Sequence, residues 1–101
     1  MIETKEQLIS ELARNSEAIK SFGVERIGLF GSFAKESPKV GSDVDLLVEF
    51  SLGAKSFDNF MKLSFFLEEL TGRNVDLVTR ESLSPYIGPK ILAEVEYGII
   101  D

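Results

Sequence analysis

The stretch LFGSFAKESPKVGSDVDLLV, residues 29–48, decides the fold. Its apolar ends predict two strands, and the Gly, Ser and Pro residues between them predict a turn and a polar loop. The first strand is expected to end at Gly31-Ser32, where a short helical turn begins. The second strand opens on two aspartates, Asp43 and Asp45.

The two aspartates are two positions apart, so in a strand their side chains point to the same face. Carboxylates that close repel each other unless a cation lies between them, and Mg²⁺ suits such a site because it prefers oxygen ligands. The simpler alternative is a pair of solvent-facing residues at the start of a strand. Because aspartate is depleted in strands, two of them at this spacing favour the metal.

Gly31 and Ser32 lie where a strand gives way to a helix. Backbone N–H groups at such a junction can bind phosphate, and glycine allows a close approach. The alternative is an ordinary turn in which Ser32 caps the helix. The two interpretations are compatible, and together with the aspartates they indicate phosphoryl or nucleotidyl transfer.

Gly31-Ser32, followed after ten residues by Asp43-Val44-Asp45, resembles the signature of the DNA polymerase β-like nucleotidyltransferase superfamily. The chain is most similar to the minimal nucleotidyltransferases, which are antitoxin partners of HEPN-type toxins. The resemblance extends over nearly the whole chain and includes the later strand around Asp76. Taken alone, Asp76 would be read as a polar residue on a strand.

The resemblance implies roles for these residues. Asp43, Asp45 and Asp76 would coordinate two Mg²⁺ ions, and Asp76 would also draw the proton from the attacking hydroxyl. Gly31 and Ser32 would bind the triphosphate of ATP.

Lys35 and Glu36 depart from the family pattern, in which Arg-Gly is usual at these positions. Lys35 keeps a positive charge for the nucleotide but lacks the planar fork that suits phosphate. Glu36 adds a negative charge near the expected triphosphate. This departure weakens the case for tight nucleotide binding without touching the aspartates.

Composition limits the possible chemistry. A length of 101 residues predicts one domain, residues 1–101, with a modest core. Without cysteine or histidine, acid–base and metal chemistry falls to carboxylates. The net charge of −6 argues against extensive nucleic-acid binding. The absence of cysteine fits a cytoplasmic protein, and no signal peptide or membrane span is expected.

Hydrophobic periodicity predicts an α/β two-layer domain. The expected elements are a helix from about Lys5 to Lys20 with Thr4 as N-cap, a strand from Val24 to Phe30, a short helix beginning at Phe33, a strand from about Asp43 to Phe50, a helix from Phe57 to Leu70, a strand from Asn74 to Val78 and a helix beginning at Leu83-Ser84-Pro85. From the resemblance we expect the nucleotidyltransferase fold, with a mixed sheet of three or four strands. Its helices would pack on one face and the catalytic cleft would lie on the other.

The helix from Phe57 to Leu70 carries more apolar residues than one stripe needs. Phe57, Met61 and Phe65 form a second stripe, which either packs on the terminal helix or contacts another chain. Ile99 and Ile100 add an apolar tail that is expected to support partner binding.

Together these features predict a Mg²⁺-dependent enzyme that transfers AMP from ATP. By resemblance, its acceptor is a hydroxyl, expected to be a tyrosine, on a HEPN-type toxin that it silences as an antitoxin. The alternative is a partner-binding module that neutralises the toxin by complex formation with little or no catalysis. Transfer to a small molecule such as an aminoglycoside is disfavoured because no second domain supplies a pocket. An exposed apolar stripe would favour a homodimer or a hetero-oligomer.

Overall fold

The computed structural model describes residues 1–39 and 41–100. Three strands form one mixed sheet in the order β1-β2-β3: β1 (Val24–Phe30), β2 (Val44–Phe50) and β3 (Val75–Thr79). β1 runs antiparallel to β2, and β2 runs parallel to β3. The predicted mixed sheet is confirmed.

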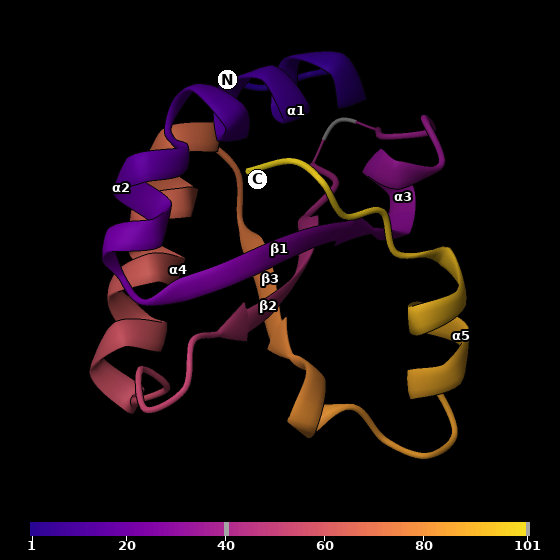
Figure 1. Ribbon diagram of the computed structural model, residues 1–101. Helices are drawn as coiled ribbons and strands as arrows, with labels where there is room; N and C mark the ends of the chain where they lie inside the picture. The colour runs from indigo at the N-terminus through magenta and orange to yellow at the C-terminus, as the bar shows by residue number, and fades with distance from the viewer. Residues whose placement is uncertain (40, 101) are drawn as a thin grey trace.

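The helices of the described residues are α1 (Lys5–Arg14), α2 (Ser16–Ser21), α3 (Gly31–Ala34), α4 (Phe57–Thr71) and α5 (Gly88–Glu94), with a 3₁₀ turn η1 (Arg80–Ser82). Figure 1 shows α1, α2 and α4 gathered on one side of the strands, while α3 and α5 lie at the other side. Within the part of the chain that the structure describes, every helix is too short or too polar to span a bilayer.

The core lies between the sheet and the first group of helices. It contains the predicted apolar faces of the strands and helices: Ile27 and Leu29 of β1, Val44, Leu46 and Val48 of β2, Val75 and Leu77 of β3, Leu8 and Leu12 of α1, and Leu63 and Leu67 of α4. Each fully buried side chain of this size stabilises the fold by about 1.5–3 kcal/mol. This layer fixes which face of the sheet is left for the site.

The helix boundaries follow local chemistry. Thr4 and Gln7 form the predicted capping box of α1, with Thr4 Oγ1 accepting from the Gln7 N–H at 3.1 Å. The predicted single helix to Lys20 is wrong, because the chain breaks at Asn15. The Asn15 side chain donates to the Glu11 carbonyl at 2.8 Å and so competes with the helical hydrogen bonds.

The last helix also begins later than predicted, at Gly88 instead of near Ser84. Ser84 accepts from the Ile87 N–H at 3.1 Å through its hydroxyl and from the Gly88 N–H at 2.8 Å through its carbonyl. These bonds hold residues 85–87 in a turn that precedes the helix. α3, in contrast, begins earlier than predicted, at Gly31 instead of Phe33.

The C-terminal segment is part of the core, so the expectation that Ile99 and Ile100 form a partner-binding tail is wrong. Ile100 is 2% exposed, and both residues belong to the main apolar cluster. Glu96 forms an antiparallel bridge with Leu29, with 2.9 Å hydrogen bonds in both directions. The chain therefore covers the outer edge of β1 with its own C-terminal segment.

The second apolar stripe of α4 is left uncovered by the terminal helix. Phe57 is 78% exposed and Phe65 61% exposed, while Met61 is partly buried. α5 packs beside α3 instead of against α4. Of the two alternatives for this stripe, packing on the terminal helix is therefore wrong.

Candidate active site

The parallel pairing of β2 and β3 places two of the predicted carboxylates directly opposite each other. Asp45 pairs with Asp76 in the register, and neighbouring strands are about 4.8 Å apart. Paired residues point to the same face, which here is the face away from the core. The adjacency that the sequence could not establish is thus present.

The crowding of carboxylates affects the pKa of Asp45. Burial, the largest cause, and the negative charges of Asp76, Asp43 and Glu94 together raise the pKa of Asp45 to about 6. A carboxylate in such surroundings is stabilised by a nearby cation.

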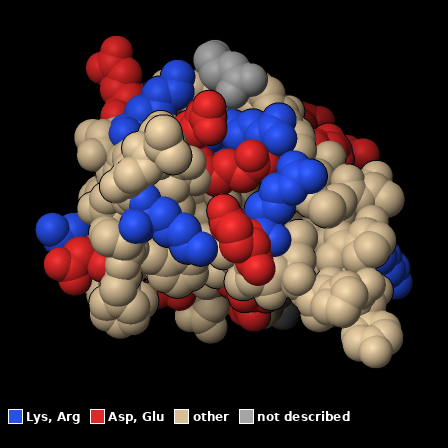
Figure 2. All heavy atoms as spheres, turned by 60° about the horizontal axis from the view of Figure 1, so that its bottom comes forward, with Lys and Arg blue, Asp and Glu red and all other residues tan. Residues whose placement is uncertain are grey.

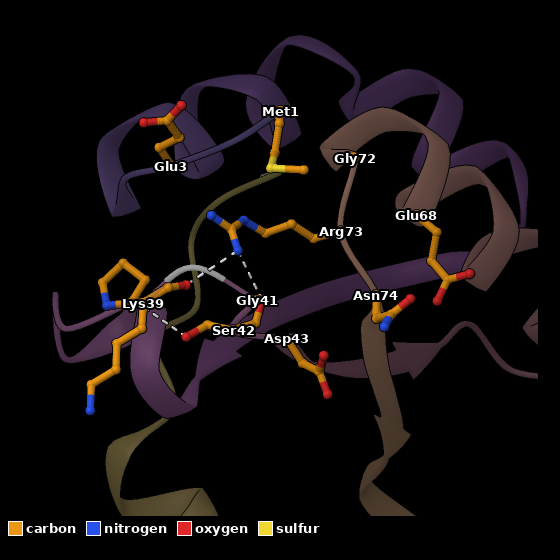
Figure 3. Close-up of a pocket in the computed structure, with 11 residues that line it drawn as sticks. Met1, Glu3, Lys39, Gly41, Ser42, Asp43, Glu68, Gly72, Arg73 and Asn74 are labelled. Carbon is orange, nitrogen blue, oxygen red and sulfur yellow. Dashed lines mark hydrogen bonds between the residues drawn. The ribbon is translucent and has the colours of Figure 1, made fainter.

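Asp43 lies just outside β2 and is exposed. It contributes charge to Asp45 from two residues away but belongs to a different hollow of the surface. That hollow is an open cavity of about 770 Å³ at the edge where β2 and β3 begin, and it also includes Ser42, Glu68, Arg73 and Asn74 (Figure 3). Neither Asp45 nor Asp76 lines it.

Arg73 holds the wall of this cavity together. Its Nη1 donates to the Ser42 carbonyl at 3.1 Å (Figure 3). Its Nε donates to the Ile2 carbonyl at 2.6 Å. The guanidinium also lies 5.1 Å from the ring centroid of Phe33. Arg73 thereby fixes the loop that leads into Asp43, a role that nothing in the sequence pattern indicated.

Gly31 is the residue on which the site's geometry depends most directly. Its φ is +75°, and a Cβ at this position would lie 2.1 Å from Oδ2 of Asp45. Only glycine permits both this backbone conformation and this approach. The predicted glycine turn therefore brings the start of α3 against the central carboxylate.

Ser32 lies in the first turn of α3 and is partly buried. The alternative that Ser32 caps the helix is wrong, because the N-cap position is Phe30 and no side chain caps it. α3 is a single turn, so its N–H groups act as parts of a loop and not as a long helix terminus.

Lys35 and Glu94 form an ion pair that the sequence analysis did not anticipate. Lys35 Nζ lies 3.5 Å from Glu94 Oε2, which joins α3 to the last residue of α5. Glu94 is thus a third carboxylate near Asp45, besides Asp76 and Asp43, and no sequence spacing signals it. Glu36 adopts φ +57°, a left-handed conformation that glycine adopts at less cost.

Asp45 and Asp76 offer adjacent carboxylate oxygens, the ligand type that Mg²⁺ prefers. Among residues 1–39 and 41–100, no group of three or more acidic side chains is close enough to form a complete metal site. The donor chemistry therefore fits a hard divalent cation bound by Asp45 and Asp76. Asp43, two residues before Asp45, is the nearest further carboxylate in the sequence.

A nucleotidyltransferase domain model matches residues 6–97. The chain belongs to this nucleotidyltransferase family, as the motif at residues 31–45 predicted.

One sequence relative and one solved structure show which members of the family this chain is similar to. The protein adenylyltransferase MntA of Thermococcus cleftensis is 42% identical over 95 residues, which cover 93% of this chain and 95% of the relative. A solved structure assigned as a minimal nucleotidyltransferase superposes with a TM-score of 0.71 at 33% identity, over 87% of this chain and 93% of that one. The predicted fold is confirmed by this likeness.

A more distant structure shares the fold. It is the complex of a tri-AMPylated HEPN toxin of Shewanella oneidensis with an MNT antitoxin, with a TM-score of 0.56 at 20% identity. The match covers 83% of this chain and 68% of that one.

Proposed function

We propose that this chain is a Mg²⁺-dependent protein adenylyltransferase that transfers AMP from ATP to a tyrosine hydroxyl of a HEPN-type toxin. The observation that carries the proposal is the pairing of Asp45 with Asp76, with the Gly31 backbone packed against Asp45. The relative named as a protein adenylyltransferase supports AMP as the transferred group. The AMPylated toxin in the distant complex supports the acceptor class.

Each residue would have a separate task. Asp45 and Asp76 would bind Mg²⁺, and Asp43 would turn from its separate hollow to join them, so that the three hold two ions. The bound ions would supply charge stabilisation to the reacting phosphate. Gly31 and Ser32 would bind the triphosphate through backbone N–H groups and the Ser32 hydroxyl. Lys35 would reach the nucleotide only by leaving Glu94.

Asp76 would orient the acceptor, because it is the more exposed member of the carboxylate pair. The acceptor oxygen attacks the α-phosphorus, the bond to the bridging oxygen breaks, and pyrophosphate leaves. The proton of the hydroxyl passes to Asp76 as the new bond forms. ATP and such a toxin would meet this chain in the cytoplasm.

A second candidate function is neutralisation by binding alone. It is favoured by the exposed Phe57 and Phe65 and by the engagement of Lys35 with Glu94. In this case the chain would form a hetero-oligomer with the toxin while the site turns over slowly or not at all.

The test separates transfer from binding. Purified chain, its toxin partner and α-labelled ATP are mixed with Mg²⁺, and both label on the toxin and complex formation are measured. We expect Asp45→Asn to abolish labelling while the complex still forms, and Asp58→Asn, an exposed substitution on α4, to change neither. Equal labelling by wild type and Asp45→Asn would overturn the assignment. An unlabelled toxin that is neutralised equally by both would favour the binding module.

A further inference from the structure

The two outer edges of the sheet differ. The outer edge of β1 is bridged by Glu96, whereas β3 is the last strand on its side of the sheet. An outer strand presents backbone N–H and C=O groups that can pair with another chain. The free edge of β3 belongs to the strand that carries Asp76.

The hydrogen-bond pattern identifies which groups of β3 point outward. The Val44 N–H donates to the Asn74 carbonyl at 2.9 Å. In a parallel pair, every second residue directs its N–H and C=O to the neighbouring strand. The backbone groups of Asp76 and Val78 therefore bond to β2, and those of Val75, Leu77 and Thr79 face the outer edge. The Val75 N–H donates to the Glu68 side chain at 3.1 Å, and the Thr79 carbonyl accepts from the Ser82 hydroxyl at 2.8 Å. Among the described residues, Leu77 is the outward-facing residue of β3 whose N–H and C=O both lack a hydrogen-bond partner.

An apolar hollow lies beside these groups on the helix side of the sheet. Its volume is about 440 Å³, and its lining includes Phe57 and Phe60 of α4 with Leu77 and Thr79 of β3. Phe57 is 78% exposed at the rim, so its ring is available to a side chain that enters. The hollow and the Asp76 carboxylate therefore lie on opposite faces of this edge strand.

β3 carries the acidic Asp76 near its start and is followed directly by the basic Arg80. At the carboxyl end of β3, Arg26 and Arg80 share the carboxylate of Glu49, and Arg80 is the weaker partner because it lies 3.9 Å away against 2.9 Å for Arg26. Lys55 and Glu81 are paired with each other at 3.6 Å. Figure 2, which brings the lower side of Figure 1 forward, shows basic and acidic side chains interspersed across the middle of that face. Arg80 would attract an acidic residue of a bound segment.

We propose that the acceptor segment of the partner protein binds as a fourth strand on the free edge of β3. This inference rests on the proposed function for the identity of the acceptor, but not for the docking itself. Side chains alternate along an added strand. A residue opposite Asp76 would lie on the carboxylate face, and its direct neighbour, opposite Leu77, would point into the hollow.

This geometry specifies the segment. It has a tyrosine opposite Asp76, an apolar residue immediately beside the tyrosine in sequence, and an acidic residue about four positions from the tyrosine, toward Arg80. The other possible occupant is β3 of a second copy of this chain. The net charge of −6 on each copy opposes that pairing.

The test uses two synthetic peptides of identical composition that differ only in register. In one, leucine is adjacent to tyrosine. In the other, leucine is two positions away and so would lie on the same face as tyrosine. Binding is measured without ATP, by affinity and by hydrogen exchange of the Leu77 amide at millimolar peptide. We expect the first peptide to bind about tenfold more tightly, as burial of one leucine implies, and to protect the Leu77 amide.

Two variants of α4 provide matched controls. Phe57→Glu places a charge at the rim of the hollow and should remove the tenfold preference. Phe65→Glu lies on the same helix, is also exposed and does not line the hollow, so it should preserve the preference. Equal affinity for the two peptides, or an unprotected Leu77 amide, would overturn the proposal. So would slow exchange of the Leu77 amide without peptide in a dimeric protein, which would assign the edge to a second copy.

Adding Mg²⁺ and ATP to the same samples separates the two proposals. Register-dependent binding without AMP on the peptide would overturn the proposed transferase activity and leave the docking edge in place. AMP on both peptides at equal rates would support the transferase and overturn the docking edge.

Discussion

At the scale of single residues, Gly31 shows most directly how the backbone serves the site. Gly31→Ala would place a methyl group 2.1 Å from Asp45 Oδ2 at a φ of +75°. We expect AMP transfer to fall by about 100-fold, since a misplacement of this kind moves the reacting groups by about an ångström. Gly98→Ala is the matched control, because its φ is +84° and no atom of the described residues lies within 4 Å of the added Cβ. A Gly31→Ala variant with wild-type transfer rates would contradict this role.

Glu36 illustrates a residue that costs stability where the family usually has glycine. Its φ of +57° is unfavourable for a residue with a Cβ. Glu36→Gly should therefore raise the free energy of unfolding by about 1 kcal/mol, which corresponds to a rise in Tm of roughly 4–8 °C. Thermal unfolding followed by circular dichroism measures this change. A lower Tm for Glu36→Gly would show that the Glu36 side chain stabilises the loop by other contacts.

Asp45 links stability to pH. Its folded pKa of about 6 is above its ordinary value of 3.8, so the folded state holds the Asp45 proton more tightly than the unfolded state does. The free energy of unfolding should therefore fall as pH rises between about 4 and 6, and stay lower above that range. Asp45→Asn removes this dependence and should raise stability at pH 8 by roughly 1 kcal/mol, discounted for the solvent exposure of the site.

Urea unfolding of both proteins at pH 5 and pH 8, without divalent cations, measures the effect. If the wild type instead gained stability from pH 5 to pH 8 relative to Asp45→Asn, folding would lower the pKa of Asp45, which contradicts the raised pKa. Added Mg²⁺ should raise the stability of the wild type selectively, because bound cations stabilise the folded state by mass action.

At the scale of elements, the sequence predicted what depends on periodicity and local motifs. The strands follow from alternating apolar residues, and the end of α4 follows from Gly72. The Gly31 turn follows from the motif at residues 31–45. The break at Asn15 and the late start of α5 depend on side-chain hydrogen bonds that periodicity does not reveal. The Lys35–Glu94 ion pair joins elements far apart in sequence, so no local pattern could predict it.

The C-terminal segment is the element whose role differed most from expectation. An apolar tail looks the same in sequence whether it binds a partner or its own core, and only packing distinguishes the two. Ile100→Ala should lower the free energy of unfolding by about 2–4 kcal/mol, because the side chain is 2% exposed. Ile87→Ala, at a residue that is 56% exposed, should change it by less than about 0.5 kcal/mol. Urea unfolding at one pH compares them, and equal effects would contradict the burial of the tail.

At the scale of the whole molecule, α1, α2 and α4 cover one face of a small sheet, and the carboxylates lie on the other face, on the side of α3 and α5. The core side fixes the register of β2 and β3, and that register sets Asp45 beside Asp76. The same arrangement leaves β3 as an uncovered edge with Phe57 beside it. β3 thus carries both Asp76, which pairs with Asp45 of β2, and the edge that we propose for the partner segment.

The most direct measurement of the central claim is the mass of the toxin partner after incubation with this chain, Mg²⁺ and ATP. We expect the wild type to add AMP to a tyrosine, and Asp76→Asn, which keeps the shape of the side chain but removes its charge, to add none. Asp58→Asn should behave as the wild type does. A toxin whose mass is unchanged by the wild type, or which is modified equally by Asp76→Asn, would contradict the claim that Asp45 and Asp76 form an adenylyltransferase site.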